Sequence, residues 1–283
     1  MLMNFFLFIL GSAVGSFLNV VALRYKPDKF LFGRQILGRS HCPHCRHKLS
    51  WFELVPLLSF AFQLGRCRNC QKNISWRYPI VEIISGLIFV FIPLALFSAY
   101  LLPTTYYLLS FLWVFIFSVL LLVALIDLRL SIIPDEVHTL LLVAGAGLTY
   151  LERDLALFER SFLGSYSLIF GFGENIWTNH IIAAIVGGLI FGFVIFVTRG
   201  RGMGMGDLKL AIPLGFIFGW PDIFVLIGLS FVVGALVGVY VILFRHLHFK
   251  SAIPFGPFLV AGSALVFFFG KELADFYFGL FPV

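Results

Sequence analysis

An uncharged stretch of 44 residues decides the fold class: residues 83–126 read IISGLIFVFIPLALFSAYLLPTTYYLLSFLWVFIFSVLLLVALI. A hydrocarbon core of about 30 Å needs about 20 helical residues, so this stretch is long enough for two membrane-spanning helices. The whole chain is 60% apolar and only 12% charged, whereas soluble domains are about 25% charged. This composition excludes a disordered chain, a secreted disulfide scaffold and an ordinary cytosolic enzyme. It predicts an all-α polytopic membrane protein.

Further uncharged runs predict the remaining spans. We expect a turn near Ser98–Thr105, with Pro103, to divide the 44-residue stretch into two. Six other runs bring the predicted number of spans to eight: 1–23, 137–151, 175–198, 210–221, 223–244 and 251–270. The runs 137–151 and 210–221 are the shortest, and runs of that length also suit a re-entrant or buried helix.

The spans suggest three parts of the chain. Residues 1–23 form a first transmembrane helix, which we expect to be retained because its start lacks the basic residues of a signal peptide. Residues 24–78 form a basic loop. Residues 79–283 form a membrane core of seven helices.

The basic loop sets the predicted orientation. Residues 24–78 hold eleven Lys or Arg and two acids, and short basic loops stay on the cytoplasmic side. With eight spans, 17 of the 20 Lys and Arg then lie inside and both termini lie outside. This bias, together with attraction to anionic membrane lipids, explains the charges without a nucleic-acid partner.

All four cysteines lie in the basic loop, as two C-x2-C pairs separated by 21 residues: Cys42, Cys45, Cys67 and Cys70. Two such turns can complete a tetrahedral site of four sulfur ligands, which suits Zn²⁺. A closed site of this kind is structural. An iron centre and redox or disulfide pairs are the alternatives, but disulfides are the poorer interpretation for a cytoplasmic loop.

Two other features lie in this loop. His41, His44 and His47 flank the first cysteine pair, and we interpret them as polar loop residues rather than metal ligands. The apolar run 51–58 is too short to span a membrane. It either packs under the predicted zinc site of the four cysteines, called the cysteine clip below, or lies along the inner membrane surface. We expect it to pack under this clip.

Two aspartates stand at the ends of apolar runs. Asp127 directly follows the 44-residue stretch, and Asp207 lies in Gly202-Met203-Gly204-Met205-Gly206-Asp207-Leu208-Lys209. The predicted topology places both carboxylates at the inner face. We expect helices that start at or near each acid, which would place each carboxylate near the positive end of a helix dipole.

Paired carboxylates at a membrane boundary favour aspartic peptide hydrolysis, because two close carboxyl groups share one proton. Gly204 and Gly206 would let an extended substrate approach the acid and would tolerate positive φ. The alternatives are a helix cap or a salt bridge, with Arg129 or Lys209 as the partner. A proton-coupled transporter using both acids as a relay is the rival function.

Three further acids have local interpretations. Asp135 follows Pro134 and suits the first turn of the next helix. Glu82, at the start of the second span, is a candidate third buried acid. Asp222 is expected outside, in a turn or cap.

The chain resembles the bacterial type IV prepilin peptidases, a family of intramembrane aspartic proteases with a Gly-x-Gly-Asp motif. The resemblance runs nearly end to end. It rests on these features: Gly15-Ser16-Phe17-Leu18-Asn19-Val20 with Arg24, the two C-x2-C pairs, Arg77-Tyr78-Pro79, Val81-Glu82 with Gly86, Asp127 with Ile132, Pro134 and Asp135, and Gly204-x-Gly206-Asp207 with Lys209.

The resemblance implies an eight-span protein of the bacterial inner membrane whose catalytic pair, Asp127 and Asp207, faces the cytoplasm. It implies that Gly204, Gly206 and Lys209 shape the site and that the four cysteines bind structural zinc. The implied substrates are prepilin and pseudopilin precursors, cut after a Gly that precedes their apolar helix. It further implies N-methylation of the new N-terminus with S-adenosylmethionine. The cysteine pairs and the basic loop argue against the presenilin or signal-peptide-peptidase type of aspartic protease, and the all-cysteine ligand set argues against a zinc hydrolase. The oligomeric state is not predicted.

Overall fold

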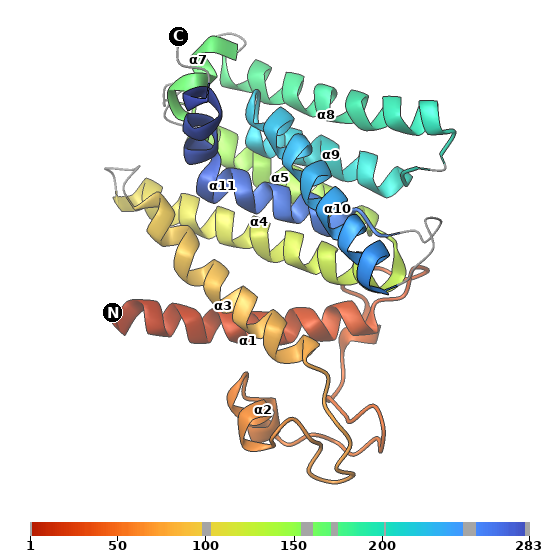
Figure 1. Ribbon diagram of the computed structural model, residues 1–283. Helices are drawn as coiled ribbons and strands as arrows, with labels where there is room; N and C mark the ends of the chain where they lie inside the picture. Colours follow the sequence, from red (N-terminus) through yellow and green to blue (C-terminus); the bar gives the residue numbers. More distant parts are fainter. Residues whose placement is uncertain are drawn as a thin grey trace. The chain divides into compact units, whose positions relative to one another are not determined.

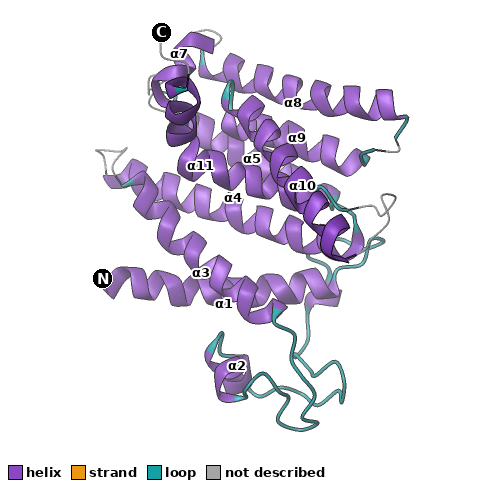
Figure 2. Cartoon of the chain, in the orientation of Figure 1, coloured by secondary structure: helices purple, strands orange, loops and turns teal. Residues whose placement is uncertain are grey.

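The computed structural model describes residues 2–97, 103–153, 161–170, 175–200, 202–245 and 253–280. These residues form helices and loops without a strand, apart from two isolated β-bridges in the cysteine loop (Figure 2). The all-helical prediction is confirmed. Part of the predicted turn at Ser98–Thr105 lies outside the described residues, as do Arg160, Arg201 and Lys250 of the charge count.

Six of the described helices are long and apolar enough to cross a membrane, judged by length and composition. They confirm a multi-pass membrane protein. Their bounds are α1 Leu2–Arg24, α3 Arg77–Leu96, α4 Pro103–Leu130, α8 Ile176–Thr198, α10 Asp222–Arg245 and α11 Gly256–Gly279.

The two shortest predicted runs also form helices. They are α5, Asp135–Leu151, with 17 residues, and α9, Met205–Phe218, with 14 residues. Neither is among the six helices that are long enough to span on their own, so the number of eight spans stays a prediction. The short helices α7 (Ser167–Phe170) and η3 (Gly164–Tyr166) precede α8.

The chain divides into two compact units, Met1–Leu122 and Val123–Val283, with the division inside α4. In the first unit α1 packs against α3 (Figure 1). A Cβ added at Gly15 of α1 would lie 2.7 Å from the Cβ of Ser85 in α3, so glycine permits the close approach. The loop between these helices contains η1 (Arg34–Ile36), η2 (Trp51–Leu54) and α2 (Leu58–Phe62).

In the second unit α9 packs against both α5 and α8, and α10 packs against α11 (Figure 1). Gly215 of α9 lies directly against the backbone of Ala183 in α8. Helix α9 is therefore enclosed by its neighbours, and its buried residues include Leu210, Ala211 and Leu214. Both predicted catalytic aspartates belong to this unit.

Candidate active site and cysteine clip

Asp127 lies in the last turn of α4, and only 4% of its surface is exposed. Its Oδ2 accepts a hydrogen bond of 2.9 Å from the backbone N–H of Gly256. Gly256 is the first residue of α11, and a proline follows it within the first turn. The carboxylate of Asp127 therefore faces the N-terminal end of a 24-residue helix.

This arrangement corrects one prediction. We expected a helix to start at or near Asp127, but α4 continues to Leu130 and the next helix starts at Asp135. The apolar run before Asp127 is long enough for α4 to extend past the acid. The positive helix end at Asp127 belongs instead to α11 and is brought there by packing.

Gly256 is a candidate site residue that the sequence reasoning missed. A Cβ added to it would lie 2.6 Å from Oδ2 of Asp127, closer than real Cβ contacts. Only glycine therefore leaves room for the buried hydrogen bond as it stands. The available signal was a Gly-Pro pair at the start of the last long apolar run, which is typical of a helix N-terminus.

Asp207 lies in the first turn of α9, as expected, and is 8% exposed. Its Oδ2 accepts a bond of 3.3 Å from the N–H of Gly204. Asp207 is outside the six helices that are long enough to span. Burial raises the pKa of Asp207 to about 6, and the charge of nearby Asp127 contributes to this rise.

The glycines before Asp207 do not use the positive φ that glycine tolerates. Gly204 has φ −84°, and Gly206 is not among the residues with positive φ. A Cβ would meet its nearest atom at 3.7 Å on Gly204 and 3.5 Å on Gly206, which is ordinary contact. That these glycines admit a substrate backbone stays a prediction.

Lys209 forms a salt bridge with neither Asp127 nor Asp207, the two acids that we considered as its partners. Its Nζ lies 2.7 Å from Oδ1 of Asp135, the first residue of α5. The hydrogen bond and charge of Lys209 lower the pKa of the Asp135 carboxyl. Lys209 thus links the starts of α9 and α5, two positions after Asp207.

Glu82 and Asp222, the other two acids that the sequence analysis singled out, are both buried. Glu82, 6% exposed, accepts a 2.8 Å bond from the N–H of Leu57, which confirms the predicted third buried acid. Asp222, the first residue of α10, is completely buried and accepts bonds of 2.6 Å from the Ser161 hydroxyl and 2.8 Å from the Phe162 N–H. These bonds join the start of α10 to the loop that precedes η3.

The cysteine loop is built from two matching turns. In the first, the N–H of Cys42 donates to the carbonyl of His47, and in the second the N–H of Cys67 donates to that of Lys72, both at 2.9 Å. Each turn is closed by an antiparallel bridge, and each has a residue with positive φ after its second cysteine, Arg46 or Gln71. The C-x2-C spacing therefore produces the same local structure twice.

The four cysteine sulfurs form one cluster, with every pair of Sγ atoms within 4.8 Å and Cys42 3.9 Å from Cys70. Tetrahedral Zn–S bonds of about 2.3 Å place sulfurs about 3.8 Å apart, so this donor set fits the ion. A backbone hydrogen bond at His47 and the side chain of Asn69 lower the pKa of Cys45 to about 6, which favours a thiolate at this one sulfur. At Cys70 a backbone hydrogen bond at Lys72 lowers the pKa, but burial and the neighbouring cysteines outweigh it and raise the pKa to about 11. The three neighbouring histidines are not part of the cluster.

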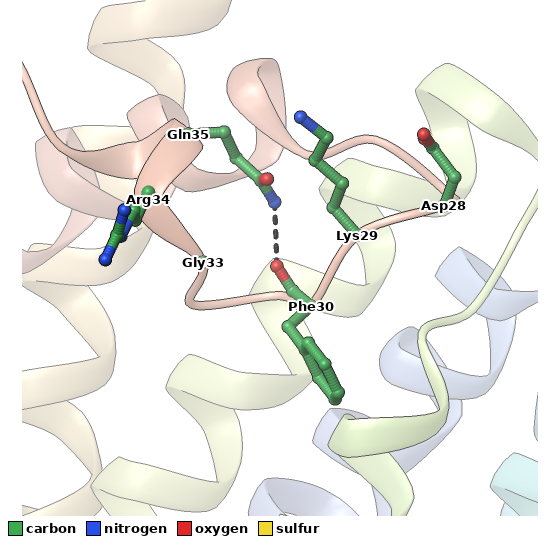
Figure 3. A pocket seen from close by; sticks show the side chains of 6 residues that line it. All are labelled: Asp28, Lys29, Phe30, Gly33, Arg34 and Gln35. Carbon is green, nitrogen blue, oxygen red and sulfur yellow. Dashed lines mark hydrogen bonds between the residues drawn. The ribbon is translucent and has the colours of Figure 1, made fainter.

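A separate hollow of about 520 Å³ lies in the turn that follows α1 (Figure 3). Gln35 crosses it and donates a 2.7 Å hydrogen bond to the carbonyl of Phe30. Asp127, Asp207 and the cysteines do not line this hollow. Most of the residues that do line it are exposed: Asp28, Lys29, Phe30, Gly33, Arg34 and Gln35. We assign no chemistry to it.

Asp127 and Asp207 are both buried, and each accepts a hydrogen bond from a backbone N–H at a helix N-terminus, that of α11 or α9. Two such carboxylates in a multi-helix membrane chain are the arrangement expected of a membrane-embedded aspartic hydrolase. Comparison with known families points the same way. The Bacterial Peptidase A24 N-terminal domain matches residues 9–96, and the Type IV leader peptidase family matches residues 114–239.

Curated relatives extend this similarity over almost the whole chain. The prepilin leader peptidase/N-methyltransferase of Bacillus subtilis (strain 168) is 30% identical and covers 96% of each chain. The protein of the same name from Aeromonas hydrophila is 31% identical over 95% of this chain and 92% of its own. That from Burkholderia pseudomallei (strain 1026b) is 33% identical over 94% and 85%.

The chain therefore belongs to the prepilin leader peptidase/N-methyltransferase family. These comparisons give no support to the rival function of a proton-coupled transporter. No solved structure matches the chain.

Proposed function

We propose that this protein is a membrane aspartic endopeptidase that removes the short basic leader of prepilins and pilin-like secretion or competence proteins. In this proposal Asp127 and Asp207 are the catalytic pair. The observation that carries it is the burial of both carboxyl groups within one unit, each held by a backbone N–H at a helix start.

The two aspartates have different roles in the proposed reaction. Asp127 starts the reaction ionised, because its carboxylate accepts a hydrogen bond from the N-terminal end of α11, and a helix N-terminus favours negative charge. Asp207 carries the shared proton, because its burial and the charge of Asp127 favour the neutral form.

Hydrolysis then follows in two steps. Asp127 removes a proton from water as the water oxygen bonds to the scissile carbonyl carbon, and Asp207 donates its proton to the carbonyl oxygen. The C–N bond breaks as the amine nitrogen takes the proton held by Asp127. Asp207 recovers its proton from the hydroxyl of the new carboxyl group. The cycle balances without a metal at the aspartates.

The cysteine clip has a structural role in this proposal. Cys42, Cys45, Cys67 and Cys70 hold Zn²⁺, and a closed shell of four sulfurs leaves no position for substrate. The ion, when bound, cross-links the two matching turns of the loop. The loop is thereby fixed next to α1 and α3.

The proposed second activity is N-methylation of the new N-terminus with S-adenosylmethionine. It is supported by the names of the relatives, prepilin leader peptidase/N-methyltransferase. Among the described residues we identify no site whose groups fit this cofactor, so no step is derived for the transfer. The basic loop of residues 24–78 is the proposed region.

The proposed setting is the bacterial inner membrane, with the aspartates at the cytoplasmic face. The excess of Lys and Arg in residues 24–78 supports this orientation. A substrate with an apolar helix in the bilayer and a charged leader in the cytoplasm would then present its cleavage site at the depth of the carboxylates.

The test is cleavage of a purified prepilin in detergent by the wild type and by Asp127→Asn and Asp207→Asn. Asparagine keeps the shape of the side chain but cannot exchange a proton. Asp28→Asn, which changes an exposed acid in the loop, is the matched control. We expect Asp127→Asn and Asp207→Asn to lose cleavage, while the control cuts at the wild-type rate. All variants should keep their helical circular dichroism. Cleavage near the wild-type rate by Asp127→Asn or Asp207→Asn would refute the proposed pair.

A further inference from the structure

A short apolar segment in the cysteine loop exposes several large side chains. It consists of residues 51–62 and contains η2 and α2. Trp51 is 80% exposed, Leu58 55% and Phe62 84%. The prediction that the run 51–58 packs under the clip is therefore wrong for its largest side chains. Clustered exposed apolar side chains of this kind mark a contact surface.

A partly buried hydrogen bond places this segment beside a membrane helix. The N–H of Leu57 donates to Oε2 of Glu82 at 2.8 Å. Glu82 lies five positions after Arg77, the first residue of α3, which is about 7.5 Å along the helix axis. Helix α3 is long and apolar enough to span. The segment therefore folds back along α3 instead of extending away from its end.

The backbone at the centre of the segment is held in a strained conformation. Leu57 has φ 61° and ψ −49°, a region that side chains other than glycine rarely adopt. Such a conformation persists only where its surroundings fix it. The hydrogen bond to Glu82 does so here, and it fixes the direction in which α2 leaves the turn.

The charges around the segment are basic and largely uncompensated. Residues 24–78 contain eleven Lys or Arg against two acids. One of these acids, Glu53, is buried and accepts a 2.8 Å bond from the N–H of Ser50 at the start of η2. The guanidinium of Arg68 lies 5.2 Å from the centre of the Phe52 ring. This surface attracts anions and repels a basic peptide.

We propose that residues 51–62 are a lipid-facing anchor that lies in the headgroup region of the bilayer beside α3. The apolar side chains of Trp51, Leu58 and Phe62 enter the upper acyl chains, and Arg68 meets anionic headgroups. Tryptophan and basic residues around a short apolar helix are typical of a segment at the membrane interface. The charge argues for anionic lipid and against the basic prepilin leader as the occupant.

The test uses the full chain in lipid nanodiscs whose acyl chains are brominated near the headgroups, since bromine quenches nearby tryptophan. The emission of Trp51 is obtained as the difference between the wild type and Trp51→Phe. Trp113→Phe is the matched control, because Trp113 is 2% exposed inside the protein. We expect brominated lipid to reduce the Trp51 emission by at least half and to leave that of Trp113 much less affected.

Lipid charge provides a second measurement. Trp51 quenching should be stronger in discs that contain phosphatidylglycerol than in discs of phosphatidylcholine alone. Arg68→Gln should reduce this difference, with prepilin cleavage unchanged. Equal Trp51 emission in brominated and plain lipid would overturn the proposal. If that emission were also blue-shifted, the segment would be covered by protein, either the second unit or another copy of the chain. The result is independent of whether the aspartates are catalytic.

Discussion

The cysteine clip and the aspartate pair are assembled in opposite ways. The clip takes all its sulfurs from one loop, with Cys42 and Cys70 28 positions apart. The aspartate pair depends on three helices, and the hydrogen bond from Gly256 to Asp127 joins residues 129 positions apart. The clip is fixed by local turns, whereas the carboxylates depend on the packing of distant helix ends. Changes at helix contacts should therefore affect the two regions very differently.

Gly256→Ala is expected to give the largest difference between the two regions, with cleavage at the aspartate pair lost and zinc at the cysteine clip retained. The added Cβ would lie 2.6 Å from Oδ2 of Asp127 and would displace the carboxylate. We expect a loss of cleavage of about 100-fold or more, similar to the loss of a positioned hydrogen-bond donor in other enzymes. The measurement is the rate of prepilin cleavage, with zinc content as the second readout.

Gly228→Ala is the matched control, because a Cβ at Gly228 of α10 meets nothing within 4 Å. It should cut normally. The Gly256 variant should keep its zinc, since the clip lies in the other unit. Normal cleavage by the Gly256 variant would mean that this hydrogen bond does not position Asp127.

Cleavage should also depend on pH in a defined direction. Asp207 must be protonated, and its pKa is raised to about 6. As pH rises through that value the proton is lost and both carboxylates become charged. We expect kcat/KM to fall by about tenfold per pH unit on the alkaline side. A flat profile up to pH 8, measured with one substrate at constant ionic strength, would contradict the protonated role of Asp207.

The clip should respond to changes that leave the aspartates intact. Cys42→Ala removes one of four metal ligands, so bound zinc should fall from about one ion per chain to nearly none. Proteolysis within residues 24–78 should become much faster. Cleavage of prepilin should fall less than about tenfold, because the aspartates lie in the other unit.

His44→Ala is the control for this change, since His44 lies between two ligands but is not in the cluster. It should retain zinc and resist proteolysis. Loss of zinc from His44→Ala, or full zinc in Cys42→Ala, would show that the ligand set is wrong.

The smallest effect is expected at Asp135, the exposed acid that pairs with Lys209. Asp135 pairs with Lys209 but is largely exposed, and exposed ion pairs contribute about 0–1 kcal/mol. Asp135→Asn should change cleavage by less than about threefold. An effect as large as that of Asp207→Asn would place Asp135 in the catalytic machinery. It would contradict the assignment of catalysis to the buried acids alone.

The difference between the regions also explains what the sequence could predict. The C-x2-C pairs encode their own turns, so the cluster was predictable from spacing. The apolar runs likewise predicted the long helices, and the Gly-x-Gly-Asp motif predicted Asp207 in the first turn of α9. These features depend on neighbours in the sequence.

Features that depend on packing were missed or predicted wrongly. The approach of α11 to Asp127 involves residues on helices far apart in sequence, so no local pattern shows it. Helix α4 continues past Asp127 because nothing in the sequence stops it before Ser131, which has positive φ. The exposed side of residues 51–62 depends on the hydrogen bond between Leu57 and Glu82, which the pattern of apolar residues does not reveal.

The proposed catalytic pair, Asp127 and Asp207, should act as one unit. The most direct test compares single-turnover prepilin cleavage by Asp127→Asn, Asp207→Asn and the double variant, each with intact zinc and helical content. Residues that act together give losses that do not multiply. We expect each single variant to lose almost all cleavage and the double variant to be no slower than the slower single variant. Losses that multiply in the double variant, or near-normal cleavage by either single variant, would contradict it.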